Sequence, residues 1–381
     1  MSLDFEINAE QQELKGEVSE LAKELGSKVE EWERKGEAPT ELFQKMGVRR
    51  WMGPIVPLEY DGMGKGAIEY SIISEELARV GLFGPQTTIQ AEKCLLASGT
   101  SEQKANYLPK LARGEYIAAI AISERDVGSS FELMETMAVK RKDAYVLNGH
   151  KSHINFAADA GIILVYVKTE SGLSIFIIER GTPGINFKKG NPIGQRMQPI
   201  YNVTLKNVEI PQTQLLGREG DAMSTFFATF NLSRIGNASC LIGLARGALE
   251  EAIRYAKERR VGQHMVTDFQ GLRWMVAELV TKIEAATLLR DKAAWLADRG
   301  VEHSSETAMA RYYAAEVAED VTSQVFSLVG GWGCYRERPF ERFWRDAKVG
   351  KLAGGSSEIL KNLIARRMLG KERGPLIDKA E

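Results

Sequence analysis

The chain has 381 residues, of which 44% are hydrophobic and 27% are charged, so it is long enough for two or three domains with substantial cores. Lys and Arg number 50 against 51 Asp and Glu, and the formal net charge is -1. Because no basic excess exists to neutralise phosphates, the composition predicts neither a nucleic-acid partner nor a membrane partner.

The cysteines and histidines argue against a disulfide framework and against a metal site. Cys94, Cys240 and Cys334 lie far apart in the chain and form no CxxC pair. The histidines show no HExxH spacing or other pattern typical of metal ligands. We therefore expect no bound metal and a reducing, cytoplasmic location.

The first region, residues 1–114, is predicted to be an all-α domain. Asn8 followed by Gln11 forms a plausible capping box at the start of a helix. A stripe of apolar residues at helical spacing then predicts one long helix with a buried face; its members are Leu14, Val18, Leu21, Leu25, Val29 and Trp32. Further helical patterns cover residues 41–46, 67–80 and 101–111.

The second region, residues 115–220, has the pattern of a β domain. Short β-branched segments bounded by Gly or Pro follow one another, among them GIILVYVKT, LSIFIIERG and YNVTLKNVEIP. Within AVKRKDAYVLNGHKSHI, the pair Asn148-Gly149 predicts the tight turn of a hairpin.

The third region, residues 221–381, returns to the helical period. One long helix carries Leu241, Leu244, Ala248 and Ala252 on one face, a loop spans residues 262–267, and further helices are expected to about residue 296, over 306–329 and over 356–369. The chain is therefore predicted to be an α+β multidomain protein, with an N-terminal helical domain, a middle β-barrel or sandwich and a C-terminal four-helix bundle.

Seven segments in this order resemble motifs of the acyl-CoA dehydrogenase family. They are VPLEYDGMG, SEELAR, AISERDVGSS, LNGHKSHINF, YAKERRVGQHMVTDFQ, LVGGWGCYRERPFERFWRDAK and KLAGGSSEIL. The resemblance extends over nearly the whole chain. It implies FAD as the cofactor, an acyl-CoA thioester as the substrate, an electron-transferring flavoprotein as a partner, and a homotetramer in which neighbouring subunits share the FAD site.

The resemblance also implies roles for individual residues. Ser123 and Asn155 match positions whose side chains reach the flavin ring, and an Asn amide retains a hydrogen-bond donor there. Residues expected at the remaining FAD contacts are Arg259, Gly330, Gly331 and Ser356. Residues expected to contact the CoA thioester are Ser129 and Arg234.

The family's usual catalytic carboxylate is missing at both positions where the resemblance places it. Counted from the RDA motif, the first position is Gly354, and the second, on the bundle helix before Arg234, is Ser233. Neither residue is a strong general base at neutral pH, and general-base catalysis is typically worth 10²–10⁴-fold in rate. The backbone N–H of Gly354 is still expected to donate to the thioester carbonyl.

Glu92 is the candidate for a relocated base. It lies in TTIQAEKCLLASGT, a segment that matches the floor of the family's acyl pocket, and it is charged among apolar neighbours. The alternative interpretation of Glu92 is a solvated helix residue paired with Lys93.

The sequence thus predicts an FAD-dependent acyl-CoA dehydrogenase that acts on an atypical, cyclic or branched, acyl group. Two alternatives keep the fold but not the reaction. One is an acyl-CoA lyase or desulfinase that cleaves a bond without an α-base. The other is a non-catalytic subunit of a heteromeric acyl-CoA dehydrogenase.

Overall fold

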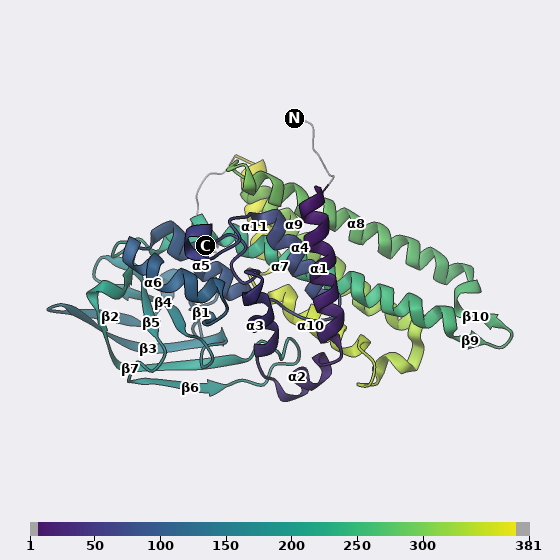
Figure 1. Cartoon of the computed structure of the whole chain (residues 1–381), viewed down its shortest axis with the longest axis horizontal. Coiled ribbons are helices and arrows are strands. Elements are labelled where there is room, and N and C mark those ends of the chain that lie inside the picture. Colours follow the sequence, from purple (N-terminus) through teal and green to yellow (C-terminus); the bar gives the residue numbers. More distant parts are fainter. Residues whose placement is uncertain (1–6, 371–381) are drawn as a thin grey trace, which may run out of the picture.

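The computed structural model describes residues 7–370 and contains the predicted order of helical, β and helical regions (Figure 1). Residues 1–6 and 371–381, the outer ends of the first and third predicted domains, lie outside the described residues. In Figure 1 the sheet lies at one end of the molecule, and the longest helices extend away from it toward the other.

The N-terminal region is helical. Its elements are α1 (Ala9–Gly26), α2 (Val29–Lys35), α3 (Thr40–Val48), η1 (Leu58–Tyr60), α4 (Ala67–Ala78), α5 (Gln86–Ser98) and α6 (Ser101–Ala112). The Asn8 capping box is confirmed, since the Gln11 amide donates to Oδ1 of Asn8 at 2.9 Å and the Asn8 amide donates to Oε1 of Gln11 at 3.1 Å. The prediction of a single long helix was wrong. Helix α1 ends near Ser27 and Val29 begins α2, although the apolar stripe stays buried through Val29.

The middle region is an eight-stranded mixed sheet with the order β6-β7-β3-β2-β4-β5-β8, in which β1 pairs in parallel with β4. The strands are β1 (Ala118–Ala121), β2 (Met137–Arg141), β3 (Ala144–Asn155), β4 (Ile162–Thr169), β5 (Gly172–Glu179), β6 (Ile185–Lys189), β7 (Ile200–Pro211) and β8 (Leu215–Leu216). Short 3-10 turns occur at η2 (Phe131–Leu133) and η3 (Gln212–Gln214).

The predicted turn at Asn148-Gly149 was wrong. The hairpin between β2 and β3 turns at Lys142, whose φ is 50°, and β3 runs on through Gly149. A Cβ atom on Gly149 would lie 2.6 Å from the Thr136 hydroxyl, and the pairing of β3 with β7 shifts register at this point. Gly149 therefore lies in a β-bulge, where the Thr136 side chain approaches its backbone closely. An Asn-Gly pair can occur in such a bulge as well as in a tight turn.

The C-terminal region contains the long bundle helices. They are α7 (Ala222–Glu258), α8 (Gln270–Asp298), α9 (Ser304–Val329), α10 (Phe340–Leu352) and α11 (Ser357–Met368). The expected loop after α7 instead forms a small hairpin, β9 (Arg260–Val261) with β10 (His264–Met265), followed by η4 (Val266–Asp268), and η5 (Gly330–Cys334) follows α9. Helix α10 was not predicted. No helix in the described residues is long and apolar enough to span a bilayer.

Helix α10 joins all three regions through two adjacent side chains. Arg345 donates to Glu33 of α2 at 2.8 Å and to the backbone carbonyl of Ile193 at 2.6 Å. Asp346 is fully buried and accepts from the backbone N–H of Gln195. Burial raises the pKa of Asp346 to about 6, although this N–H and two arginines oppose the rise. The loop between β6 and β7 is therefore anchored on the bundle.

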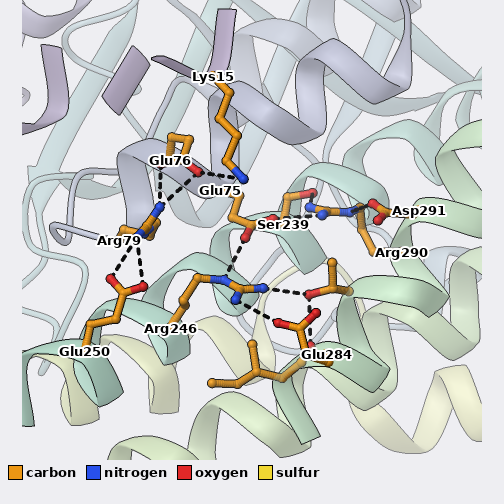
Figure 2. Close-up of polar contacts among 12 residues, drawn as sticks. Lys15, Glu75, Glu76, Arg79, Ser239, Arg246, Glu250, Glu284, Arg290 and Asp291 are labelled. Atoms are coloured by element: carbon orange, nitrogen blue, oxygen red, sulfur yellow. Dashed lines mark hydrogen bonds and ion pairs between the residues drawn. The ribbon is translucent and has the colours of Figure 1, made fainter. Parts of the chain in front are cut away.

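A buried ion-pair network joins α4 to α7 and α8 (Figure 2). Glu75 accepts from Arg290 at 2.7 Å and from Arg246 at 3.0 Å, and Arg290 also donates to the Ser239 hydroxyl at 3.1 Å. Burial alone would raise the pKa of Glu75, but Arg290 and Arg246 outweigh burial and hold that pKa below its usual value. This network fixes α4 against α7, the two helices that carry Tyr70 and Arg234.

Candidate functional site

An aromatic stack lies along the first turns of α7 and connects Ser129 with Arg234. Phe131, two residues after Ser129, packs edge-on against Phe226 at 5.1 Å, and Phe226 stacks on Phe230 at 4.3 Å. The guanidinium of Arg234 lies 4.8 Å from the Phe230 ring centre, a cation–π contact. The two residues predicted to contact the thioester are therefore at the same end of α7.

The turn at Gly354 lies beside the middle of α7. Gly354 and Gly355 have φ of 73° and 101°, backbone conformations that a residue with a side chain rarely adopts. A Cβ atom on Gly354 would stand 2.7 Å from Nδ2 of Asn237, so the Asn237 amide borders the space that a side chain at this position would enter. Arg311 of α9 holds the preceding turn by donating to the carbonyls of Gly350 and Ala353.

Glu92 on α5 is completely buried, and neither carboxyl oxygen has a hydrogen-bond partner among residues 7–370. Helix α5 runs antiparallel along α7, with Ser98 bonded to Thr225 and Cys94 in contact with Thr229. Burial raises the pKa of Glu92 well above its usual value. A solvated Glu92 paired with Lys93 is thus not what the structure contains.

Tyr70 of α4 lies between Glu92 and the Gly354 turn. A Cβ atom on Gly236 would be 2.0 Å from the Tyr70 hydroxyl oxygen, so the phenol lies directly on the α7 backbone next to Asn237. Within the described chain this buried hydroxyl has no hydrogen-bond partner. Burial, with the Cys240 thiol and the Glu92 carboxylate adding to it, raises the pKa of Tyr70 well above its usual value. Tyr70 is therefore a protonated donor beside the pocket.

A cavity of about 790 Å³ opens at the same end of α7. It is lined by Asn231, whose side chain accepts from Arg234 at 3.2 Å, and by Lys93, the neighbour of Glu92. Lys65 and His303 also line it. The cavity thus adjoins both Arg234 and the segment that carries Glu92, and its lining combines the cationic Lys65 and Lys93 with the carboxylates of Asp298 and Glu302.

The β-domain side of the site is held by a buried ion pair. Glu124 accepts from Lys151 at 2.8 Å and from the backbone N–H groups of Glu135 and Thr136 at 2.6 and 3.0 Å. Lys151 also donates to the carbonyl of Ile122 at 3.0 Å. Burial lowers the pKa of Lys151 to about 8, against the opposing effect of Glu124. The pair fixes the loop on which Ser123 stands.

Ser123 and Asn155 are brought together by strand β3 and its neighbours. The carbonyl of Ser123 accepts from the Ser152 N–H at 2.8 Å, and the Asn155 amide donates to the Gln198 carbonyl at 3.3 Å. Gln198 lies in the loop that α10 anchors, and α10 leads directly to Gly354. Ser356 begins α11 as its N-cap residue. The structure therefore places Ser123, Asn155, Gly354 and Ser356 on adjoining elements.

Arg259, Gly330 and Gly331 lie elsewhere, at the far end of the bundle. Arg259 follows the last residue of α7, and Gly330 follows the last residue of α9. At this end of the bundle the Arg338 guanidinium lies 5.9 Å from the centre of the Tyr255 ring. At 1.5 Å per helical residue, the end of α7 is roughly 30 Å from Asn237. Figure 1 shows this end, marked by β9 and β10, pointing away from the sheet. One chain thus separates the predicted FAD contacts into two groups.

Four residues of the site were not singled out from the sequence: Lys151, Tyr70, Asn237 and Arg311. Arg311 carried a usable signal, because it stands four residues after the buried Thr307 and four before the buried Ala315, on the apolar face of α9. A charged residue at a core position of a helix indicates a functional or paired group. Asn237 and Tyr70 carried no such signal, since their positions depend on how α4, α7 and the Gly354 turn meet.

Comparison with known proteins identifies the family. Acyl-CoA dehydrogenase N-terminal, middle and C-terminal domain families match residues 8–115, 119–208 and 222–369. The chain belongs to the acyl-CoA dehydrogenase family. It is 35% identical over 382 residues to a short-chain specific acyl-CoA dehydrogenase of Clostridium acetobutylicum, covering 96% of this chain and 100% of the relative.

Two further relatives have informative descriptions. The caffeyl-CoA reductase-Etf complex subunit CarC of Acetobacterium woodii is 34% identical over 362 residues, which is 92% of this chain and 95% of the relative. The structure of butyryl-CoA dehydrogenase from Megasphaera elsdenii superposes with a TM-score of 0.92 at 28% identity, covering 96% of this chain and all of that one. The predicted fold and family are confirmed, and the activity is that of an acyl-CoA dehydrogenase.

FAD is the cofactor of this family, and the residues of this acyl-CoA dehydrogenase fit it. Cβ atoms on Gly330 and Gly331 would meet nothing within 4 Å, so their backbone is open to a pyrophosphate. Arg259 is exposed and supplies a positive charge at the same end. At the other end, the half-buried Ser123 and Asn155 provide hydrogen-bonding groups for a flavin ring.

Proposed function

We propose that this acyl-CoA dehydrogenase oxidises an atypical, cyclic or branched, acyl-CoA with Glu92 as its general base. The observation that carries the proposal is the Glu92 carboxyl, which is fully buried and lacks a partner among the described residues. A buried carboxyl without partners is costly, and such groups concentrate at functional sites. Because Glu92 extends from α5 and not from the Gly354 turn, it approaches the α-carbon from another direction, which favours an acyl group of another shape.

The other residues of the site divide the remaining work. We assign the Gly354 N–H to the thioester carbonyl, where a fixed donor stabilises the enolate oxygen. Ser129 and the cavity beside Asn231 receive the CoA portion, Arg234 faces the acyl end of the thioester, and Lys65 and Lys93 face the phosphates of CoA. Glu92 removes the α-proton as the carbon–carbon double bond forms. Bound FAD supplies the acceptor for the hydride that leaves the β-carbon.

The glycines at positions 354 and 355 do not by themselves provide room for a wide acyl group, because the Asn237 amide borders the space beside Gly354. The preference for a cyclic or branched group therefore rests on the displaced base.

Anaerobic reduction of the bound flavin by a panel of cyclic, branched and straight-chain acyl-CoA thioesters tests the proposal. We expect at least one cyclic or branched thioester to bleach the flavin of the wild-type holoenzyme. Glu92→Gln should slow this reduction by about 10²–10⁴-fold, the usual worth of a general base. Glu102→Gln, which changes an exposed glutamate of α6, is the matched control and should have no effect.

The same panel distinguishes the two alternatives. Cleavage of a thioester with no flavin reduction would replace the dehydrogenase with a lyase or desulfinase. Purified protein that takes up no FAD and converts nothing would indicate a non-catalytic subunit. Full turnover by Glu92→Gln would reject the base assignment and leave the family activity standing.

We also propose a homo-oligomer, with a tetramer as the expected form. The two groups of predicted FAD contacts, Ser123 with Asn155 and Arg259 with Gly330, lie at opposite ends of one chain, so a second copy is needed to complete each site. An electron-transferring flavoprotein is the proposed acceptor, supported by the CarC relative, whose name places it in an Etf complex. The cytoplasmic location stays a prediction from cysteine usage.

A further inference from the structure

Two buried arginines beside the Gly354 turn lack a counter-ion. Arg311 is fully buried, and its Nε and Nη1 have no partner in the described part of the chain. Arg234 is 9% exposed, and its Nε is likewise unpartnered among residues 7–370. The partners they do have are neutral: Asn231 for Arg234, and the carbonyls of Gly350 and Ala353 for Arg311.

Arg290 shows how the same bundle treats a buried arginine with a structural role. It is 5% exposed, but it donates to Glu75 at 2.7 Å and to Asp291 at 2.5 Å. A buried cation is normally compensated in this way, because taking a charge out of water costs several kcal/mol. Arg234 and Arg311 depart from that rule together.

The two charges also act on each other. Burial lowers the pKa of Arg234 to about 10, and burial together with the charge of Arg234 lowers the pKa of Arg311 to about 10. Both side chains still carry their positive charge at neutral pH, so two buried cations lie close enough together to repel one another. Glu92 does not compensate them, because the cause of its raised pKa is burial, with no arginine counteracting it.

Arg311 lies close to position 354. Its Nε lies 3.8 Å from the point where a Cβ atom on Gly354 would stand. This is the position at which the resemblance places a carboxylate in most of the family. The chain has lost that anion while retaining two cations around its place.

We propose that the substrate itself supplies the missing anion, as a carboxylate on the acyl group that Arg234 and Arg311 bind. The inference rests on the proposed function and adds the substrate class: a CoA monothioester of a dicarboxylic acid. Arg311 still has donors for it, because Nε and Nη1 are unpartnered among residues 7–370 while Nη2 is bonded to the carbonyls of Gly350 and Ala353. Nη2 belongs to both parallel N–H forks of the guanidinium, so Arg311 meets the carboxylate through single N–H donors, and the unpartnered Nε of Arg234 supplies another.

Binding of matched thioester pairs to the holoenzyme tests the proposal. The first pair is glutaryl-CoA and pentanoyl-CoA, and the second is 4-carboxycyclohexanecarbonyl-CoA and cyclohexanecarbonyl-CoA. Calorimetric titration of the Glu92→Gln holoenzyme measures affinity without turnover. We expect the carboxylated member of at least one pair to bind at least tenfold tighter. Equal or weaker binding of the carboxylated member in both pairs would overturn the proposal.

Arginine variants identify the groups responsible. Arg311→Met and Arg234→Met should each reduce the preference for the carboxylated thioester toward one; the preference is the ratio of two affinities in the same variant, so a general loss of thioester affinity does not affect it. Arg218→Met removes an exposed arginine and is the matched control, with an unchanged preference expected. Because Arg311 also holds the Gly354 turn, Arg234→Gln decides the matter where Arg311→Met fails to fold. A preference that survives in all arginine variants would contradict the assignment.

The outcome is separable from that of the proposed function. Affinity is measured in a variant with no general base, so the preference does not depend on whether Glu92 is that base. A carboxylated thioester that binds tightly but never reduces wild-type flavin would support the anion site and reject the oxidation.

Discussion

Nδ2 of Asn237 lies 2.7 Å from the place where a Cβ atom on Gly354 would stand. The position of the Asn237 amide on α7 therefore favours glycine at position 354, because a longer side chain there requires Asn237 to move. Under the proposed function, the absence of a carboxylate at position 354 goes together with a neighbour that borders its space. The distance favours a site adapted to glycine at this position over one that has merely lost a side chain.

Restoring the carboxylate alone should not restore the usual reaction. We expect Gly354→Glu to give no gain in flavin reduction by straight-chain thioesters. It should also destabilise the fold by about 1–2 kcal/mol, because a residue other than glycine is strained at a left-handed φ. Urea unfolding and anaerobic flavin reduction measure the two effects. Adding Asn237→Gly should relieve the crowding and recover part of the stability. A single Gly354→Glu variant with unchanged stability and a new straight-chain activity would contradict this account.

Glu92 should make stability depend on pH. Burial raises its folded pKa well above the unfolded value of 4.5. Below pH 4.5 both states hold the proton, so the group has no effect there. As pH rises from 4.5 toward the folded pKa, the unfolded state ionises first and stability is lost. Glu92→Gln should therefore raise the melting temperature at pH 7 and leave it nearly unchanged at pH 4. The same melting temperature for both proteins at pH 7 would show that Glu92 is not confined to a dry site.

The pH dependence of turnover has the opposite direction. A general base acts when it is deprotonated, so the rate of flavin reduction should increase with pH through the raised pKa of Glu92. The profile is obtained from single-turnover flavin reduction, which isolates the chemical step. A flat profile from pH 5 to 8 would be inconsistent with Glu92 as the base.

The Glu75–Arg290 pair should be worth more to stability than any exposed ion pair of the chain. Arg290→Met leaves the buried Glu75 carboxylate with Arg246 as its remaining short partner and should cost about 3–5 kcal/mol in unfolding free energy. The double variant Arg290→Met with Glu75→Gln should cost less than the single change, because the uncompensated charge is gone. Lys35→Met, at an exposed pair with Glu31, is the control and should leave stability nearly unchanged.

Co-expression of two inactive variants should test how the FAD site is shared. Glu92→Gln damages the reacting end, and Arg259→Met damages the far end of the bundle. If each site takes these ends from different chains, random two-fold pairing gives mixed pairs with one intact site, or about a quarter of wild-type activity. Activity no greater than the sum of the separate variants would assign both ends to one chain.

The sequence predicted the regular parts of this fold because those parts depend on local patterns. The Asn8 capping box and the apolar stripe from Leu14 to Val29 follow from residue spacing, and the structure contains both. Asn148-Gly149 was misassigned because glycine permits either a turn or a bulge, and the approach of Thr136 that decides between them is a tertiary contact. Helix α10 was not predicted because its RDAK segment is charged. In the structure, Arg345 and Asp346 of this segment contact the other two regions of the chain.

The site was predictable in part for the same reason. Glu92 stood out as a charge among apolar residues, but its complete burial depends on how α5 packs against its neighbours. Arg311 was recognisable as a charge on the apolar face of α9, but its place beside Arg234 depends on how α7 and α9 pack. The division of Ser123 from Arg259 follows from the length of α7, since motif order in a sequence does not tell which ends meet.

The contacts of Arg345 have a consequence for the order in which the molecule forms. Glu33 and Arg345 are separated by 312 positions in the chain, and the Gln195 loop joins the same cluster from the middle. A ribosome has released nearly the whole chain before these residues can meet, and contacts of such long sequence separation form late in folding. The loop that supports Asn155 is therefore fixed in one of the last steps of folding. Chains truncated before α10 should accumulate as helical and β parts that have not yet docked.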